Sequence, residues 1–459
     1  MRAILSSIAL AAACGGALPK TPAFVAQPGD VAIVHANVVP MDRDGVLADH
    51  AVVVRGERIV AVAPSDAVEL PPTARRIDAA GGYVLPGLAD MHVHAFTPEE
   101  MTMFVAAGVT LVRVMSGIPL VLELRRRIVA GEIVGPTIVT ASRIIDGDPP
   151  IWPMSAVVKT AAEADAVVAA QKAEGYDFLK VYARLTLAAY DAIVAAAARH
   201  GMTFVGHVPR AVTLQHALDS GQRSIEHLDG YLYALQKEGS APPTNLMFVQ
   251  RVGWLAEHAD ETKLPALVAA TVKAGTWNCP TLIVNDHIAA LDDAPALARR
   301  TRWLEYVHHE IVEAWDPKTD FRFKDVAAAD YALLRRANPI HARTVKAIAD
   351  AGGKLLVGTD AGNPYVVDGA GLHEEIELMV RAGVPRAKVV RAATAGAAEF
   401  FGQTGQFGVV APGARADLIL AEANPVAGPI AIPPVGVMLR GAWYDRAALQ
   451  KSLDALRKQ

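Results

Sequence analysis

The sequence predicts an α/β protein built on a closed parallel (β/α)8 barrel, with a small β domain made from both ends of the chain. Two observations predict this fold. Eight apolar runs alternate with helical stretches through the middle of the chain, and short alternating strands occur before and after them. Eight consecutive strand–helix units are typical of a parallel barrel. A doubly wound open sheet is the alternative, and the count of eight favours closure.

Each apolar run is bounded by turn residues and has the length of a buried strand. The eight runs are residues 84–94, 109–115, 137–141, 177–182, 202–207, 223–228, 277–284 and 353–360. Helical stretches separate them. The clearest helix runs from Leu187 to His200, with Thr186 as its N-cap and Gly201 just past its end.

The β domain is predicted from short strands with alternating apolar residues. In residues 51–62, the turn Arg55-Gly56-Glu57 separates two such strands and predicts a hairpin. Similar strands recur after the barrel, so the two ends are expected to share one domain. The expected division is a signal segment at 1–26, β-domain segments at 27–84 and 408–446, the barrel at 85–407 and a C-terminal helix at 447–459.

Two connections, 229–274 and 285–352, are much longer than a barrel loop needs. Long excursions at the catalytic face of a barrel are often lids, so 285–352 is a candidate lid. Extra helices packed outside the barrel explain its length equally well.

Composition bounds the class of protein. The 459 residues are 52% hydrophobic and 20% charged, which supports a large core. A net charge of −4 argues against a nucleic-acid partner. No apolar run reaches the roughly 18 residues of a transmembrane helix. A small-molecule substrate is the expected partner, and a homo-oligomer stays open.

Residues 1–26 resemble a secretory signal, with a positive start, a short apolar stretch and then small residues. The stretch ending in Cys14 also resembles a bacterial lipobox, which predicts a lipid anchor there; ordinary signal-peptidase cleavage nearby is the alternative. Cys279 is the only other cysteine, so no internal disulfide is expected. We expect an exported bacterial protein, periplasmic or lipid-anchored to the cell envelope.

The segment Met91-His92-Val93-His94 carries the strongest chemical signal. Because side chains alternate along a strand, His92 and His94 point to one face and can hold a divalent metal. The pair alone is weak evidence. Four more polar residues stand at or near the ends of other apolar runs, and strand ends of this kind meet at one mouth of a barrel. These four residues are Lys180, His207, His227 and Asp360.

Lys180 requires a physical reason, because it interrupts a strand that should be buried on both faces. An unpaired buried ammonium costs several kcal/mol, and burial with nearby cations lowers its pKa. A neutral amine can add carbon dioxide to form a carbamate, whose two oxygens can bridge two metals. A lone lysine would more often reach solvent, as a lone His207 or His227 would more often be a core residue. Their joint placement favours the metal site.

The segments around these residues resemble the amidohydrolase superfamily, in its imidazolonepropionase-like and prolidase-like branch, which includes the ochratoxin-hydrolysing amidases. The resemblance covers about residues 30–445 and implies a TIM-like (β/α)8 barrel with a small β-sandwich domain, usually with zinc. Its motifs are Pro86-Gly87-Leu88-Ala89-Asp90-Met91-His92-Val93-His94, the Lys180 strand, Gly206-His207, Ile225-Glu226-His227, Gly358-Thr359-Asp360-Ala361-Gly362 and Ala411-Pro412-Gly413-Ala414-Arg415-Ala416-Asp417-Leu418.

The resemblance implies two divalent ions, expected to be zinc. His92, His94 and Asp360 would hold the more buried ion, and His207 with His227 would hold the other. N6-carboxylated Lys180 would bridge the two. One-metal relatives of the deaminase type lack this lysine, so Lys180 favours the two-metal type, with single occupancy still open.

The expected chemistry is hydrolysis of an amide C–N bond by a hydroxide that bridges the metals, with Asp360 as general acid and base. A dipeptide or N-acyl amino acid, including ochratoxin-like amides, is the favoured substrate. A cyclic amide, lactone or ester is the alternative on the same site. A non-catalytic binding scaffold is disfavoured, because such a protein would normally lose metal ligands.

A substrate of this kind carries a carboxylate and calls for cations or hydroxyls near the mouth. Tyr231 is the favoured choice, as a second catalytic residue or as a ligand for the carboxylate. The alternative for every candidate is a structural role, in which the residue lies at the rim and makes only a local salt bridge or packing contact. The other candidates are Arg184, Arg210, Tyr233 and Asn363.

Overall fold

The computed structural model describes residues 23–457. The predicted signal segment up to residue 22, with Cys14, lies outside these residues. Residues 23–26 already belong to the fold, ahead of the predicted boundary. Strand β1 (Phe24–Val25) pairs in parallel with β5 (Val68–Glu69), and Ala26 is buried.

The central sheet is parallel and follows the predicted order. Neighbouring strands are consecutive along the chain, as right-handed strand–helix units require. The short β11 (Ala156–Val157) extends β10 at its edge. The seven strands are β8 (Leu88–Val93), β9 (Val109–Val114), β10 (Thr137–Asp146), β12 (Phe178–Val181), β13 (Phe204–Gly206), β14 (Ser224–Glu226) and β15 (Trp277–Cys279).

Residues 354–361 close this sheet into a TIM-like barrel. On one side, the Leu356 amide donates to the Asn278 carbonyl of β15 at 2.8 Å. On the other side, the Met91 amide of β8 donates to the Val357 carbonyl at 2.9 Å, and Val93 forms a parallel bridge with Ala361. The eighth unit is irregular, but it joins the first and last strands as the count of eight predicts.

One apolar run, 277–284, is only partly a strand. β15 ends at Cys279, and Thr281 takes a left-handed conformation with φ of 46° before α9 (Leu282–Ala289) begins. The buried Glu375 carboxylate accepts the amides of Leu282 and Ile283 at 2.9 and 2.8 Å, which satisfies the first turn of the helix. Periodicity alone does not distinguish a short buried strand from a buried helix start.

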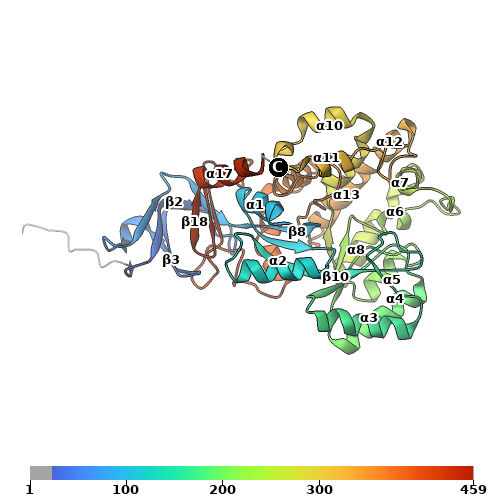
Figure 1. Ribbon diagram of the computed structural model, residues 1–459, viewed down its shortest axis with the longest axis horizontal. Helices are drawn as coiled ribbons and strands as arrows, with labels where there is room; N and C mark the ends of the chain where they lie inside the picture. The colour runs from blue at the N-terminus through green and yellow to red at the C-terminus, as the bar shows by residue number, and fades with distance from the viewer. Residues whose placement is uncertain (1–22, 458–459) are drawn as a thin grey trace, which may run out of the picture.

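Helices surround the barrel (Figure 1). The predicted helix Leu187–His200 is confirmed as α4: the Thr186 hydroxyl accepts the Ala189 amide, and Gly201 ends the helix with φ of 62°. The other helices that follow barrel strands are α1 (Pro98–Ala106), α2 (Pro119–Val129), α3 (Ala161–Glu174), α5 (Leu214–Asp219), α8 (Leu264–Ala274), α13 (Ala337–Asp350), α14 (Ala370–Arg381), α15 (Arg386–Ala392) and α16 (Ala395–Phe400).

A second sheet combines both ends of the chain, which Figure 1 shows as blue and red strands side by side. Its central junction is antiparallel, with Leu85 of β7 opposite Ile419 of β16. A β-sandwich stays a prediction. The strands of this sheet are β2 (Val31–Val38), β3 (Leu47–Arg55), β4 (Arg58–Pro64), β6 (Arg75–Asp78), β7 (Tyr83–Pro86), β16 (Leu418–Ala421), β17 (Gly436–Leu439) and β18 (Ala442–Asp445), and α17 (Arg446–Leu456) follows them.

Two tight turns meet within this second sheet. The predicted hairpin is confirmed, because β3 and β4 are joined by Gly56 and Glu57 alone. Gly441, between β17 and β18, has φ of 81°, and a Cβ there would lie 1.9 Å from the Gly56 carbonyl oxygen. Only glycine permits this approach of the two hairpins.

The long connections are mostly helical. Residues 229–274 contain α6 (Tyr231–Ala234) and α7 (Phe248–Glu257) ahead of α8, and α7 packs on α12 (Ala328–Leu334). The candidate lid also contains α10 (Ala294–Arg300) and α11 (His309–Ala314). Its loop around residue 322 reaches the barrel mouth. Within residues 23–457, no helix is both long and apolar enough to span a membrane.

Candidate metal centre

The structure brings the predicted histidines together at the barrel mouth. His92 lies in β8, and His94 directly follows that strand. His207 and His227 directly follow β13 and β14. Ring centroids of His92 and His227 are 4.7 Å apart, as are those of His207 and His227, and those of His92 and His94 are 5.5 Å apart. Strand ends distant in sequence therefore place four imidazoles in one continuous cluster.

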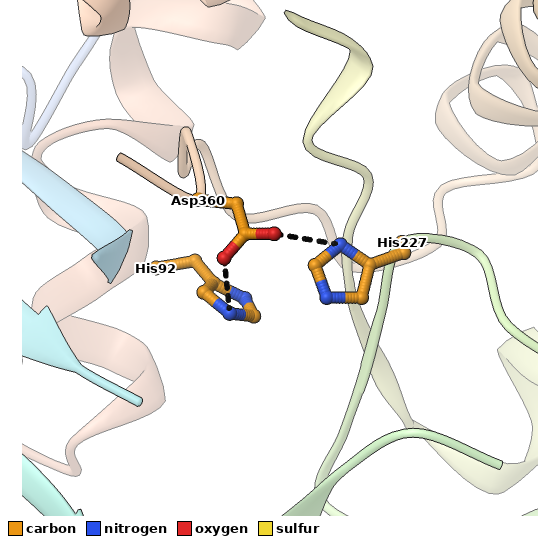
Figure 2. Close-up of side chains that lie close together, drawn as sticks. All are labelled: His92, His227 and Asp360. Carbon is orange, nitrogen blue, oxygen red and sulfur yellow. Dashed lines mark ion pairs between the residues drawn. The ribbon is translucent and has the colours of Figure 1, made fainter. Parts of the chain in front are cut away.

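Asp360 joins this cluster from the segment that closes the barrel. Its Oδ1 lies 3.2 Å from His92 Nε2 and 3.0 Å from His94 Nε2, and its Oδ2 lies 3.9 Å from His227 Nδ1. Figure 2 shows the carboxylate between the His92 and His227 rings. The ligand atoms of His92, His227 and Asp360 all lie within 4.8 Å of one another, a spacing that suits a single metal ion.

Two of these residues have an unusual backbone. His227 and Asp360 have φ of 59° and 63°, in the left-handed region that residues with a Cβ rarely occupy. Such conformations cost about 1–3 kcal/mol each and persist where the surroundings impose them. Both occur where a strand ends and its side chain turns into the cluster.

A buried ion pair supports the cluster from below. Glu226 Oε2 accepts a hydrogen bond from His92 Nδ1 at 2.8 Å, and both Glu226 oxygens accept bonds from the Arg113 guanidinium at 2.8 and 2.9 Å. All three side chains are fully buried. Although burial opposes ionisation, the Arg113 charge and the hydrogen bond from His92 hold the pKa of Glu226 well below its usual range.

This support defines the His92 tautomer. An ionised carboxylate only accepts, so Nδ1 of His92 carries a proton, and Nε2 is the ring atom left to bind a cation. His92 Nε2 faces Asp360 Oδ1, and both atoms are buried without a hydrogen-bond partner. A cation between these two atoms would satisfy both of them. The donor set therefore fits a divalent metal.

Lys180 lies in β12 and is only 1% exposed. Its Nζ is buried and has no hydrogen-bond partner. Its chain packs near Gly206, where an added Cβ would lie 3.1 Å from Lys180 Cδ. Burial lowers the pKa of its amine, which favours the neutral form that reacts with carbon dioxide.

Three residues of this site, Arg113, Glu226 and Asp229, have no role predicted from the sequence. Arg113 and Glu226 lie in strands buried on both faces, where a charge needs a partner, as for Lys180. Asp229 follows β14. Its Oδ2 lies 3.5 Å from His207 Nε2. No sequence signal marks it, because it stands in a turn after β14.

An aromatic wall borders His207. Its ring lies 4.1 Å from the Tyr182 ring, and the Tyr182 hydroxyl accepts a hydrogen bond from Trp152 Nε1 at 3.0 Å. Trp152 in turn packs edge-on against Phe321 at 5.8 Å and lies under the Arg322 guanidinium. Residues of the candidate lid thus contact this wall.

The predicted role of Tyr231 is corrected. Its side chain is 1% exposed, and its hydroxyl lies 2.7 Å from the Thr271 hydroxyl of α8. Tyr231 therefore packs between the barrel and its helical layer and presents no surface to a substrate. In a strand-end loop, position in the sequence does not reveal the direction of a side chain.

The other substrate candidates lie at the rim. Arg184 donates to the Pro149 carbonyl at 2.8 Å, and Arg210 and Tyr233 remain partly accessible. Asn363 contacts its own chain, with its amide group donating to the Asp360 carbonyl at 3.0 Å and its Oδ1 accepting from Arg322 at 2.8 Å. Asn363 thus joins the candidate lid to the Asp360 backbone.

The amidohydrolase family profile matches residues 83–445. The chain belongs to the amidohydrolase family. No curated protein matches it. Among solved structures, it is similar to a bottromycin amidohydrolase, with 26% identity, a TM-score of 0.75 and coverage of 94% of this chain and 91% of that one.

Two further solved structures share the amidohydrolase fold. A Xaa-Pro dipeptidase with bound methionine has 20% identity and a TM-score of 0.66, over 91% of this chain and 100% of that one. The A. niger ochratoxinase has 17% identity and a TM-score of 0.63, over 91% and 96%. The amidohydrolase described here is a hydrolase of C–N bonds, with residues grouped as a metal site requires.

Proposed function

We propose that this amidohydrolase cleaves dipeptides or N-acyl amino acids with two divalent ions, expected to be zinc. The observation that carries the proposal is that His92 Nε2 and Asp360 Oδ1 face each other, buried and without a hydrogen-bond partner, beside three more histidines. His92, His94 and Asp360 would hold one ion. His207 and His227 would hold the other.

Carboxylated Lys180 would bridge the two ions. Its buried amine, without a hydrogen-bond partner, supports this modification. When bound, the metals would acidify a water molecule and polarise the substrate carbonyl.

Asp360 is the proposed general acid and base. Its Oδ1 faces His92 and His94, whereas Oδ2 lies on the side of His227. Oδ2 can take the proton of the attacking water and deliver it to the leaving nitrogen. Delivery matters, because an amine leaves an amide only after it is protonated.

The rim supports a substrate with a carboxylate. Arg184 and Arg210 follow β12 and β13, so both stand near the end of the barrel that carries His207. Guanidinium groups bind carboxylates with two parallel hydrogen bonds. The fold shared with a Xaa-Pro dipeptidase agrees with an amino acid as the leaving group.

A hydrolase panel tests the proposal. We expect turnover of N-acetyl amino acids or dipeptides, loss of turnover after metal chelation, and recovery with zinc. Asp360→Asn should lower kcat by about 10²–10⁴-fold while the circular dichroism spectrum stays unchanged. Asp350→Asn, on the outer helix α13, is the matched control. Turnover of lactones or lactams alone, or full activity of Asp360→Asn, would overturn it.

We also propose export, because residues 1–26 carry the signal pattern. Cell fractionation with radiolabelled palmitate tests both the compartment and a lipid anchor at Cys14. Retention of full-length chain in the cytoplasm would contradict export.

A further inference from the structure

Three arginines gather on one side of the barrel mouth. Arg184 follows β12, Arg210 follows β13, and Arg251 lies in α7. Among residues 23–457, no carboxylate oxygen lies within 4.0 Å of a guanidinium nitrogen of these three arginines. Arg184 and Arg251 donate instead to the carbonyls of Pro149 and Leu246. Their charges are therefore not neutralised by the protein at close range.

Backbone contacts keep these arginines near the metal ligands. The Arg210 amide donates to the Ala183 carbonyl at 3.1 Å, which holds the two strand-end loops together beside Arg184. The His207 amide, just after β13, donates to the Val181 carbonyl of the neighbouring strand β12 at 3.1 Å. The loops that carry Arg184 and Arg210 thus border the proposed second metal position.

Arg251 reaches the same place from α7. Helix α7 packs against α6, which carries Tyr233, and the charges of Arg251 and Arg210 oppose the rise that partial burial causes in the pKa of the Tyr233 phenol. Arg251 Nε is also buried without a hydrogen-bond partner. A buried guanidinium nitrogen without an acceptor is costly, and an anion would satisfy it.

The local charge balance is positive. Partial burial lowers the pKa of the Arg210 guanidinium, and the nearby charge of Arg251 lowers it further. Asp229 is the acid that faces this group, and it also contacts His207 at 3.5 Å. The Asp146 carboxylate also lies beside Arg184, whose backbone amide it accepts at 2.7 Å. Three guanidiniums against two carboxylates leave an excess of positive charge, and an anionic ligand would relieve their repulsion.

We propose that Arg184, Arg210 and Arg251 form a subsite for a leaving group with two carboxylates, the aspartyl or glutamyl residue of an N-acyl amino acid or dipeptide. This inference rests on the proposed function and narrows its substrate class. One α-carboxylate occupies one guanidinium fork. The remaining positive charge matches the side-chain carboxylate of an acidic amino acid.

Two nearly isosteric substrates test the second charge. N-acetylglutamate and N-acetylglutamine differ in one charged group, so their kcat/KM ratio isolates it. Because the second carboxylate would form charge-assisted hydrogen bonds, we expect a preference for glutamate of about tenfold or more, which corresponds to about 1.4 kcal/mol or more. This preference should fall as salt rises, because exposed charges are screened. Equal kcat/KM values would overturn the inference.

Substitution assigns the preference to the arginines. Arg251→Gln should reduce the glutamate preference to about threefold or less, mainly through the KM for N-acetylglutamate. Arg76→Gln, on the exposed strand β6, is the control and should keep the wild-type ratio. An equal loss on both substrates in Arg251→Gln would show a general structural effect and contradict the subsite.

A binding measurement separates this inference from the proposed function. By calorimetry, glutarate should bind the intact protein about tenfold more tightly than butyrate, and Arg251→Gln should remove the difference. This readout does not require turnover. Selective glutarate binding without amide hydrolysis would contradict the proposed function but support the subsite. Amide hydrolysis without selective glutarate binding would support the proposed function but contradict the subsite.

Discussion

The Glu226 carboxylate lies 2.8 Å from Nδ1 of His92, and both side chains are fully buried. Glu226 thereby selects the tautomer in which His92 Nε2 is free to bind a metal. Arg113 holds Glu226 in turn through two hydrogen bonds. Hydrogen bonds from Arg113 to Glu226 and from His92 to Glu226 thus connect the barrel interior to the candidate metal site.

Glu226→Gln should destabilise the fold, because it leaves the Arg113 guanidinium buried without its counter-ion. Loss of one partner of a buried pair costs about 3–5 kcal/mol in the free energy of unfolding. Urea denaturation measures this loss. Removal of both charges, in Arg113→Met with Glu226→Gln, should restore much of it.

The same double variant separates stability from metal binding. His92 lacks its carboxylate partner there, so zinc affinity should stay about 10–100-fold weaker than in the wild type. Competition with a chromophoric chelator measures that affinity. Wild-type affinity in the double variant would show that Glu226 stabilises the barrel without positioning His92.

Lys180→Gln should reduce the bound metal from two ions per chain to one, because glutamine cannot form a carbamate. Elemental analysis of protein reconstituted with zinc and bicarbonate measures the ratio. Lys172→Gln, on the exposed face of α3, is the control. A crystal structure should show density beyond Lys180 Nζ, and an unmodified amine turned away from two bound metals would refute the bridge.

Tyr231→Phe should leave kcat within about twofold of the wild type, because the hydroxyl contacts Thr271 and not the mouth. It should lower the free energy of unfolding by about 1 kcal/mol, the usual net value of one hydrogen bond. A large loss of kcat with unchanged stability would restore Tyr231 as a catalytic residue.

Asn363→Ala should loosen the candidate lid. It removes the acceptor of Arg322 and the donor to the Asp360 carbonyl. Hydrogen exchange in residues 316–326 should become about tenfold faster or more, given about 1.5–3 kcal/mol for a bond to a charged group. Asn424→Ala, in the loop after β16, serves as the control. Unchanged exchange would show that the lid is held elsewhere.

The fold should lose stability between pH 6.5 and pH 4. Burial lowers the pKa of His341 and of His373 to about 4, against about 6.5 in an unfolded chain. In this window the unfolded chain binds more protons, so stability is complete above pH 6.5 and falls as pH decreases. Each histidine contributes at most about 1.4 kcal/mol per pH unit.

Urea denaturation at several pH values measures this slope. The double variant His341→Gln with His373→Gln should show a shallower loss of stability on acidification than the wild type. His309→Gln, with an exposed side chain, should keep the wild-type slope. An unchanged slope in the double variant would assign the acid sensitivity to other groups.

The sequence by itself determined the barrel and which candidate metal ligands converge at its mouth. Eight apolar runs and turn residues define the strand–helix units, and alternation along a strand places His92 and His94 on one face. Because parallel strand ends meet at one mouth, positions at those ends sufficed to predict that His207, His227 and Asp360 converge. These inferences need only local periodicity and one topological rule.

Only the tertiary structure decided the contacts that tune the site. The Arg113–Glu226 pair spans β9 and β14, and Arg322 of the candidate lid donates to Asn363 next to the Asp360 segment. Tyr231 and Asp229 lie two residues apart, yet Tyr231 is in the core and Asp229 lies beside the candidate metal ligand His207. Side-chain direction after a strand end depends on the loop backbone and its packing, and no local pattern encodes it.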